Sequence, residues 1–229
     1  MTARWRRWCV LLSPSDLVRL SREAHSRGLV GGIWGNASIR SEGGMTISPS
    51  GFSLADVEER TLVEVALDGS LVSDWAGISP SSEWRLHSSI YAARSEVLCV
   101  LHVHPPRSVA LSLVGDFLPP VLEEMAMLCG PVVRVADYAP PGTEELARSA
   151  LRALGDGGAV ILRNHGLVCV GRSVDEVLAT AEVCEKAAEV YLLALSTGLP
   201  VKPLPEAEAT ELRRRYLEGY GRRLWGASS

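Results

Sequence analysis

The sequence predicts an α/β fold in which helices cover a mixed or largely antiparallel sheet. Strand-like and helix-like runs alternate irregularly along the chain, and hairpin-length links join some of the strands. A doubly wound parallel sheet requires a regular alternation with longer crossovers, so it is disfavoured. With 229 residues, 47% of them hydrophobic, the chain can bury a sizeable core, and we expect a single domain over residues 1–229.

The individual elements follow from spacing, caps and turn residues. Apolar residues at helical spacing follow Ser13 or Ser15 as a cap, and Pro105 and Pro106 end a strand because neither can donate to a ladder. Ser173 and Glu176 match a capping box at the start of a long helix. In order, we expect a helix at about 15–27, a hairpin of strands 37–40 and 45–47, a strand within 61–67, a helix at 82–94, a strand at 97–103, a helix within 142–154, two strands within 159–171, a helix from 173 to about 196, an extended connector from 199 and a last helix at about 206–218.

Charge and cysteine content limit the partners and the compartment. The 23 basic and 27 acidic residues are mixed and give a net charge of -4, so we expect no nucleic-acid partner. The five cysteines are widely spaced without a CxxC pair, which indicates a reducing compartment. The apolar stretch 8–12 is too short for a signal peptide, and no segment approaches the ~20 apolar residues of a membrane helix. We therefore expect a cytoplasmic protein with no membrane partner.

The pair His102 and His104 ends the apolar run 97–103. Side chains two residues apart on a strand point the same way, so both imidazoles can face one metal ion. Imidazole suits zinc and other late divalent metals, and a catalytic zinc usually has three protein ligands. An HxH pair alone is a weak signal, and a third ligand has to be found.

His165 is the best candidate for that third ligand. It lies at a sharp Asn-His-Gly corner between two strong strands, where a histidine is an unusual choice for packing alone. His25 falls on the polar side of the first helix and is expected to be a surface residue. Glu83 and His87 are one helical turn apart and share a face. Glu83 is thus the nearest candidate for a carboxylate beside the metal, and His87 either supports the site or is a packed helix residue.

Three polar, glycine-rich segments indicate a phosphate site. They are 35–38, 48–51 and 79–83, and each offers backbone N–H groups and small hydroxyls. The last segment also precedes a helix, whose N-terminus attracts anions. Any one of them is more simply explained as a turn, but three beside a metal motif favour phosphate binding.

These segments resemble the class II aldolase/adducin family, which includes zinc-dependent fuculose-1-phosphate aldolases and ribulose-5-phosphate 4-epimerases. The resemblance runs through nearly the whole chain in the order GNASIR, ISPSG, SPSSEWRLH, VLHVHPPRSVALS, DYAPPGTEELA and LRNHGLVCVG. It implies a three-layer α/β/α sandwich around a mostly antiparallel sheet. It also implies homotetramers with active sites at subunit interfaces, so that the C-terminal tail, about 199–229, reaches toward an active site.

The resemblance further implies the role of each site residue. Zinc, or another divalent metal, is expected on His102, His104 and His165. Glu83 is implied as the catalytic acid/base, and Tyr220 as a residue that completes a neighbouring subunit's site. The residues implied to bind the substrate phosphate are Asn36, Ser50, Gly51, Ser81 and Ser82.

The implied activity is that of a zinc-dependent aldolase. Such an enzyme reversibly cleaves a sugar phosphate, here a fuculose-type or a deoxy- or methylthio-pentulose 1-phosphate, to dihydroxyacetone phosphate and an aldehyde. Glutamate at position 83 resembles the aldolases, because the epimerases carry aspartate there. Glu123 and Glu124 depart from the pattern, since the aldolases have a tyrosine in this region, and this leaves the aldehyde specificity open.

Other functions remain as alternatives on the same site. Within the family these are a ribulose-5-phosphate 4-epimerase, a methylthioribulose-1-phosphate dehydratase and a decarboxylase of sugar-acid phosphates. A non-haem iron oxygenase is a further alternative, because three histidines do not distinguish zinc from iron or manganese. An adducin-like interaction module without catalysis is disfavoured by the intact histidines and Glu83.

Overall fold

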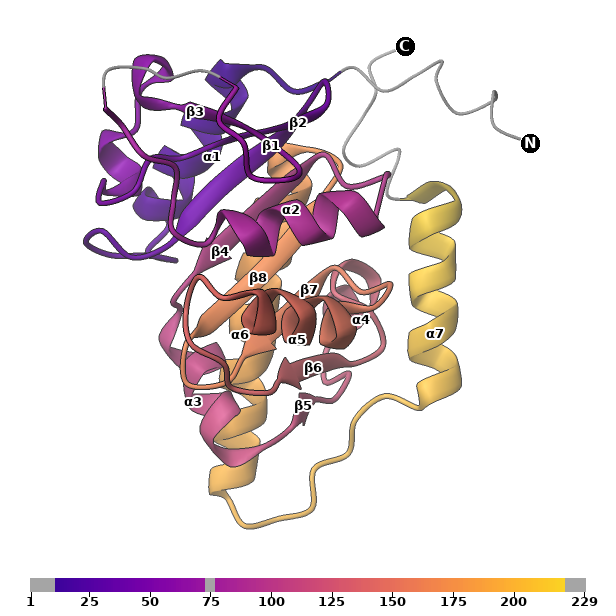
Figure 1. Cartoon of the computed structure of the whole chain (residues 1–229). Helices are drawn as coiled ribbons and strands as arrows, with labels where there is room; N and C mark the ends of the chain where they lie inside the picture. Colours follow the sequence, from indigo (N-terminus) through magenta and orange to yellow (C-terminus); the bar gives the residue numbers. More distant parts are fainter. Residues whose placement is uncertain (1–10, 73–76, 221–229) are drawn as a thin grey trace.

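The computed structural model describes residues 11–72 and 77–220 and contains an eight-stranded sheet with helices packed on it (Figure 1). The strands are β1 (Asn36–Ser41), β2 (Gly44–Ile47), β3 (Val63–Ala66), β4 (Cys99–Val103), β5 (Phe117–Leu118), β6 (Val133–Ala136), β7 (Ala159–Leu162) and β8 (Gly166–Gly171). The α-helices are α1 (Pro14–Ser26), α2 (Trp84–Ala93), α3 (Pro106–Val114), α4 (Glu123–Leu128), α5 (Glu144–Leu154), α6 (Val174–Ser196) and α7 (Glu206–Arg215). Two 3-10 turns, Leu54–Asp56 and Glu59–Thr61, and a π-helix, Tyr216–Tyr220, complete them.

The strand order is β3-β2-β1-β4-β8-β7-β6-β5. Among the described strands, neighbours pair antiparallel except β6 and β7, which are parallel. The predicted α/β class with a mostly antiparallel sheet is therefore confirmed, and the sheet is mixed. This order places β4 and β8 side by side at the centre of the sheet.

Two apolar clusters lie on opposite faces of the sheet. One contains side chains of α1, α3, α4 and α6, and the other contains side chains of α2 and α5. In Figure 1, α2 and α5 lie in front of the sheet and α6 lies behind it. Every residue of β4 is buried, and Leu101 belongs to the first cluster whereas Val100 belongs to the second. His102 follows Val100 by two residues, so it faces the side of the sheet that α2 covers.

Most of the predicted elements are present within a few residues of their expected bounds. The segment between β4 and α5 differs, because it contains α3, β5, α4 and β6, none of which was expected. Pro105 and Pro106 do end β4, but Pro106 also opens α3 at a position where a helix needs no N–H donor. The last helix is shorter than expected and continues as the π-helix.

Only one of the two hydrogen bonds of the capping box predicted at the start of α6 is present. The hydroxyl of Ser173 accepts the backbone N–H of Glu176 at 3.2 Å, as predicted. The Glu176 carboxylate, however, accepts the backbone N–H of Arg172 at 2.7 Å rather than that of Ser173. The Arg172 guanidinium also donates to this carboxylate, and a bidentate ion pair outweighs a single cap bond.

Membrane and redox expectations can be compared with the described residues. None of the helices in 11–72 and 77–220 is long and apolar enough to cross a bilayer. Four cysteines in these ranges are buried free thiols: Cys99, Cys129, Cys169 and Cys184. The stretch 8–12 lies largely outside the described residues, and the cytoplasmic location stays a prediction.

Candidate metal centre and active site

The centre of the sheet positions the first two histidines. His102 is opposite Asn36 of β1 on one side and Val168 of β8 on the other. It is completely buried, whereas His104, just beyond the end of β4, is only partly buried. Gly35 permits this close packing, because a Cβ built there would lie 2.8 Å from the His102 carbonyl oxygen.

His165 reaches the same place from the β7–β8 hairpin. Leu162 pairs with Gly166, so the loop is three residues long and holds Asn164 in the left-handed region at φ 56°. Asparagine tolerates this conformation better than most residues. The Asn164 backbone N–H donates to the hydroxyl of Ser112 on α3 at 3.0 Å, which anchors the corner.

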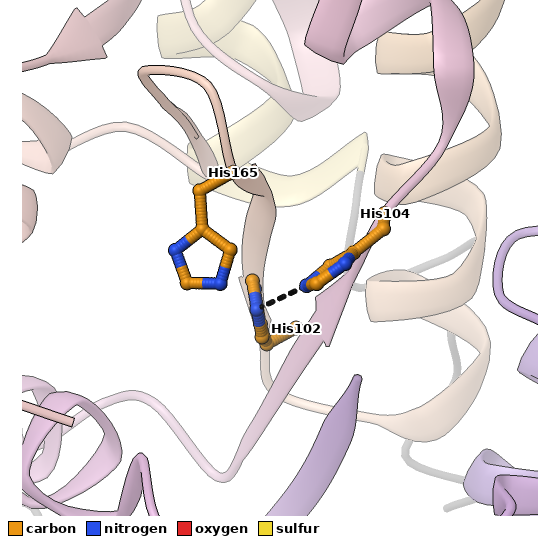
Figure 2. Close-up of side chains that lie close together, drawn as sticks. All are labelled: His102, His104 and His165. Atoms are coloured by element: carbon orange, nitrogen blue, oxygen red, sulfur yellow. Dashed lines mark hydrogen bonds between the residues drawn. The ribbon is translucent and has the colours of Figure 1, made fainter. Parts of the chain in front are cut away.

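The three histidines converge (Figure 2). Their ligand nitrogens lie within 4.8 Å of one another, and Nε2 of His104 is 2.9 Å from Nε2 of His102. The ring centroids are 4.8 to 5.0 Å apart, with the rings edge to face. Two neighbouring strands thus bring together the three histidines that the sequence singled out.

The protonation of these rings suits a metal. Nδ1 of His102 donates to the carbonyl oxygen of Leu167 at 3.1 Å, so its Nε2 lone pair faces the cluster. Burial, followed by the two neighbouring imidazoles, lowers the pKa of His104 to about 3. Burial and His102 also lower the pKa of His165. Neutral imidazoles are the form that binds metal ions, so the lowered pKa values of His104 and His165 fit a site for a divalent metal such as zinc.

Glu83 closes the site from the N-terminus of α2. Its Oε2 lies 3.0 Å from Nε2 of His102, and its Oε1 lies 3.5 Å from Nε2 of His165. The carboxylate is buried, and Oε1 has no hydrogen-bond partner among the described residues. Burial alone would raise the pKa of Glu83, but the facing imidazoles and the amide of Asn36 outweigh it and hold that pKa well below its usual range.

Four more side chains extend from Glu83 into the protein. Together with Glu83 they form what we call the polar row, whose members are, in order, Glu83, Asn36, His87, Ser38 and Tyr91. Successive members are joined by hydrogen bonds of 3.0, 2.6, 2.6 and 2.9 Å. His87 is completely buried in this row, so it supports the site and is also a packed helix residue.

The segments expected to bind phosphate lie beside one another. The backbone N–H of Ser50 donates to the carbonyl of Ser79, and that of Ser81 donates to the carbonyl of Ser48. Ser50, Gly51 and Ser82 are exposed, whereas Ser81 is buried with its hydroxyl accepting the N–H of Glu83 at 3.3 Å. Asn36 belongs to the polar row, and its role toward phosphate stays a prediction.

Three further residues were singled out from the sequence: Tyr220, Glu123 and Glu124. Tyr220 ends the π-helix, and its side chain lies outside the described residues, as does the tail 221–229. Glu123 and Glu124 open α4, where Glu124 contacts Lys186 of α6 at 2.9 Å. The parts that these residues play in the reaction stay open.

Sequence reasoning missed three groups that hold the site. They are the Leu167 carbonyl that orients His102, the Ser112 hydroxyl that anchors Asn164, and Ser38 in the polar row. Ser112 was detectable in principle, because a proline at the first position of a helix is a common start signal and would have revealed α3. The other two depend on strand register and helix packing, which local patterns do not encode.

Comparison with known sequences is consistent across the chain. Residues 15–192 match the family model described as Class II Aldolase and Adducin N-terminal domain. A 5-methylthioribulose-1-phosphate/5-deoxyribulose-1-phosphate aldolase from Rhodospirillum rubrum is 36% identical over 194 residues, which cover 84% of this chain and 86% of that protein. An L-fuculose phosphate aldolase from Escherichia coli is 31% identical over 197 residues, covering 86% of this chain and 90% of that protein.

Solved structures give the same picture of the fold. An L-fuculose 1-phosphate aldolase superimposes with a TM-score of 0.84 at 29% identity, covering 90% of this chain and 98% of the other. The corresponding enzyme from Thermus thermophilus gives a TM-score of 0.72 at 28% identity, covering 82% and 97%. The mixed sheet and its helices therefore have close structural counterparts.

Proposed function

Because the chain belongs to the class II aldolase and adducin family, we propose that it is a metal-dependent aldolase that cleaves a ketose 1-phosphate to dihydroxyacetone phosphate and an aldehyde. The observation that carries the proposal is the position of Glu83 against the histidine cluster. Three converging imidazoles and one buried carboxylate supply a metal site and a proton-transfer group in one place.

The relatives narrow the substrates to be tested first. The proteins that are 36% and 35% identical are named for 5-methylthioribulose 1-phosphate and 5-deoxyribulose 1-phosphate, and the E. coli relative at 31% is named for fuculose phosphate. We expect the pentulose 1-phosphates to be preferred. Cleavage between C3 and C4 of 5-deoxyribulose 1-phosphate yields dihydroxyacetone phosphate and acetaldehyde, which accounts for all five carbons.

The site residues divide the chemistry among them. His102, His104 and His165 would hold zinc or another divalent metal, which acts as a Lewis acid and stabilises negative charge on the ketone oxygen as the carbon–carbon bond breaks. During cleavage the C4 hydroxyl loses its proton, C4 becomes a carbonyl, and the electron pair of the C3–C4 bond passes to C3. The ionised carboxylate of Glu83 takes up the proton released from the C4 hydroxyl and delivers it to C3, and in the reverse reaction it removes a proton from C3 and returns it.

The phosphate is expected at the exposed ends of two neighbouring loops. Ser50 and Gly51 are the exposed residues of one loop. Ser82 is the exposed residue of the other loop, which leads into α2. Backbone N–H groups at a helix start favour an anion. Ser81 and Asn36 contact Glu83 directly, so they link phosphate binding to the catalytic carboxylate.

Three broader expectations belong to the same proposal. Helix sets on both faces of the sheet support a three-layer arrangement within one domain. We also expect a homotetramer in which Tyr220 and the C-terminal tail complete a neighbouring subunit's site and Tyr220 protonates or orients the aldehyde oxygen. Such an enzyme of small sugar phosphates is expected in the cytoplasm.

A substrate screen tests the proposal. Zinc-loaded protein is incubated with 5-methylthioribulose, 5-deoxyribulose and fuculose 1-phosphates, and dihydroxyacetone phosphate is measured by its enzymatic reduction with NADH. We expect release with at least one of them. Glu83→Gln should keep its zinc but lose activity by about 10²- to 10⁴-fold, the usual contribution of a general acid–base. Glu64→Gln, at an exposed position of β3, is the matched control.

Mass spectrometry of the products separates the alternatives. An isomer of unchanged mass that chromatography separates from the substrate indicates an epimerase, loss of water with all carbons kept indicates a dehydratase, and loss of carbon dioxide from a sugar-acid phosphate indicates a decarboxylase. Oxygen consumption with the iron-loaded protein would indicate an oxygenase. A folded protein that binds no metal would support the interaction module instead, and each of these results contradicts the aldolase proposal.

A further inference from the structure

The polar row continues beyond the groups that the proposed chemistry uses. Glu83 transfers the proton, but His87, Ser38 and Tyr91 lie behind it and are all buried. A buried polar side chain costs free energy unless it is hydrogen-bonded, and here each member binds its neighbours. Such a fully connected buried row can fix the orientation of each member.

The direction of each hydrogen bond follows from the Asn36 amide. Its Nδ2 group can only donate, and it donates to Oε2 of Glu83 at 3.0 Å. The carbonyl oxygen of the same amide then faces His87, which must donate from Nε2 at 2.6 Å. A neutral imidazole protonated on Nε2 accepts at Nδ1, and the hydroxyl of Ser38 donates there at 2.6 Å.

The far end of the row is consistent with this direction. Ser38 has one hydroxyl proton, which it gives to His87, so the Tyr91 hydroxyl donates to Ser38 at 2.9 Å. Burial raises the pKa of Tyr91, which therefore keeps its proton. Burial, and then His102, lowers the pKa of His87 to about 3, so its imidazole is neutral at neutral pH.

We propose that His87 is a positioning residue that holds the Asn36 amide with its N–H toward Glu83. A flip of the Asn36 amide group exchanges the positions of its oxygen and nitrogen. The carbonyl oxygen would then face the Glu83 carboxylate. Two acceptors repel each other, so Glu83 would move from the place where it meets the substrate carbon. The Nε2–H of His87 prevents this flip because it pairs only with the amide oxygen. The inference rests on the proposed catalytic role of Glu83.

Two substitutions of His87 distinguish positioning from packing. In His87→Gln the side-chain amide reaches as far as Nε2 and can still donate to Asn36. In His87→Asn the amide reaches only the Nδ1 position, near Ser38, and the donor to Asn36 is lost. Both variants place a smaller polar amide in the space of the ring, so the loss of packing is shared between them.

Steady-state kinetics of the zinc-loaded variants test the proposal. We expect His87→Asn to lower kcat by about 10- to 100-fold, as loss of a supporting hydrogen bond commonly does, with zinc content and KM little changed. His87→Gln should retain most of the wild-type kcat. Equal loss in both variants, together with a lowered Tm, would show that the ring acts by packing. Full activity in both variants would show that the Asn36 amide needs no hydrogen-bond donor from position 87. Either result would overturn the proposal.

A spectroscopic measurement tests the inference without any activity. Nitrogen-15 spectra of histidine-labelled, zinc-loaded wild-type protein report which ring nitrogen carries the proton. We expect His87 to carry it on Nε2 and to have a bare Nδ1, with His87→Gln identifying the signal. A proton on Nδ1 would reverse the row and contradict the proposal. If the wild type cleaves no ketose 1-phosphate, the proposed function fails, and this spectrum still decides the role of His87 toward Asn36.

Discussion

The imidazole of His102 donates from Nδ1 to the backbone carbonyl of Leu167 across the β4–β8 pair, at 3.1 Å. One strand thereby sets the tautomer of a histidine on its neighbour. With Nδ1 held in this way, Nε2 faces His104 and Glu83. One of the proposed metal ligands is thus oriented by the sheet, as is common where a second ring nitrogen is hydrogen-bonded.

Loss of any one ligand is expected to release the metal. Replacing His102, His104 or His165 with alanine should weaken zinc binding by more than about 100-fold, the upper end of what loss of a supporting partner costs. Metal content after dialysis and competition with a chelating dye measure this. His25→Ala, on α1, should bind zinc like the wild type. A variant of His165 that keeps its zinc would remove it from the ligand set.

A negative charge at the start of α2 is expected to oppose substrate phosphate. Ser82→Asp should raise KM for the preferred ketose 1-phosphate by at least about tenfold, because like charges placed together cost several kcal/mol. The control is Ser70→Asp, which adds the same charge at the exposed turn after β3. Steady-state kinetics of both zinc-loaded variants provide the comparison. An unchanged KM in Ser82→Asp would place the phosphate elsewhere.

Gly166 leaves space for the histidine cluster. A Cβ added there would lie 2.5 Å from the Val103 carbonyl oxygen and 2.8 Å from Cδ2 of His104. We expect Gly166→Ala to lower the free energy of unfolding by about 1–3 kcal/mol and to weaken zinc binding. Urea unfolding and zinc titration measure the two effects. Gly31→Ala is the control, because a Cβ at this exposed glycine meets nothing within 4 Å. Equal stability of the two variants would contradict this account.

The buried His87 is expected to make the metal-free protein sensitive to acid. Burial, and then His102, lowers its pKa to about 3 in the folded state, whereas a histidine in an unfolded chain titrates near pH 6.5. Between these values the unfolded state binds more protons, so the free energy of unfolding falls as the pH falls. The slope from this group approaches about 1.4 kcal/mol per pH unit.

Urea unfolding at several pH values between 3 and 6.5 measures that slope. His87→Gln removes the titrating group and should flatten the slope relative to the wild type. The control is His25→Gln, which removes a histidine of α1 that lies outside the polar row. If the wild type and His87→Gln show the same slope, His87 is not the group that takes up the proton.

The sequence predicted the histidine cluster because two kinds of local pattern coincide there. Strand alternation places His102 and His104 on one face, and the sharp corner before Gly166 marks His165 as unusual. The resemblance to a family supplied the remaining roles, including that of Glu83. The structure agrees by bringing all four side chains together.

What the sequence did not predict depends on contacts between distant segments. The helix α3 was missed because a double proline was interpreted only as the end of a strand, and with it the Ser112 anchor of Asn164 was missed. The polar row joins Asn36 and Ser38 of β1 to α2, so it exists only once the helix packs on the sheet. No periodicity within either segment indicates that pairing.

The strand order also has a consequence for folding. β4 and β8 are neighbours in the sheet but are separated in the chain by α3, β5, α4, β6, α5 and β7. A growing polypeptide therefore carries His102 and His104 long before His165 is available, and pairing of such distant strands is an intrinsically slow step. Tight zinc uptake would then occur only after β4 and β8 have paired. The time course of zinc binding would therefore report when the centre of the sheet forms during refolding.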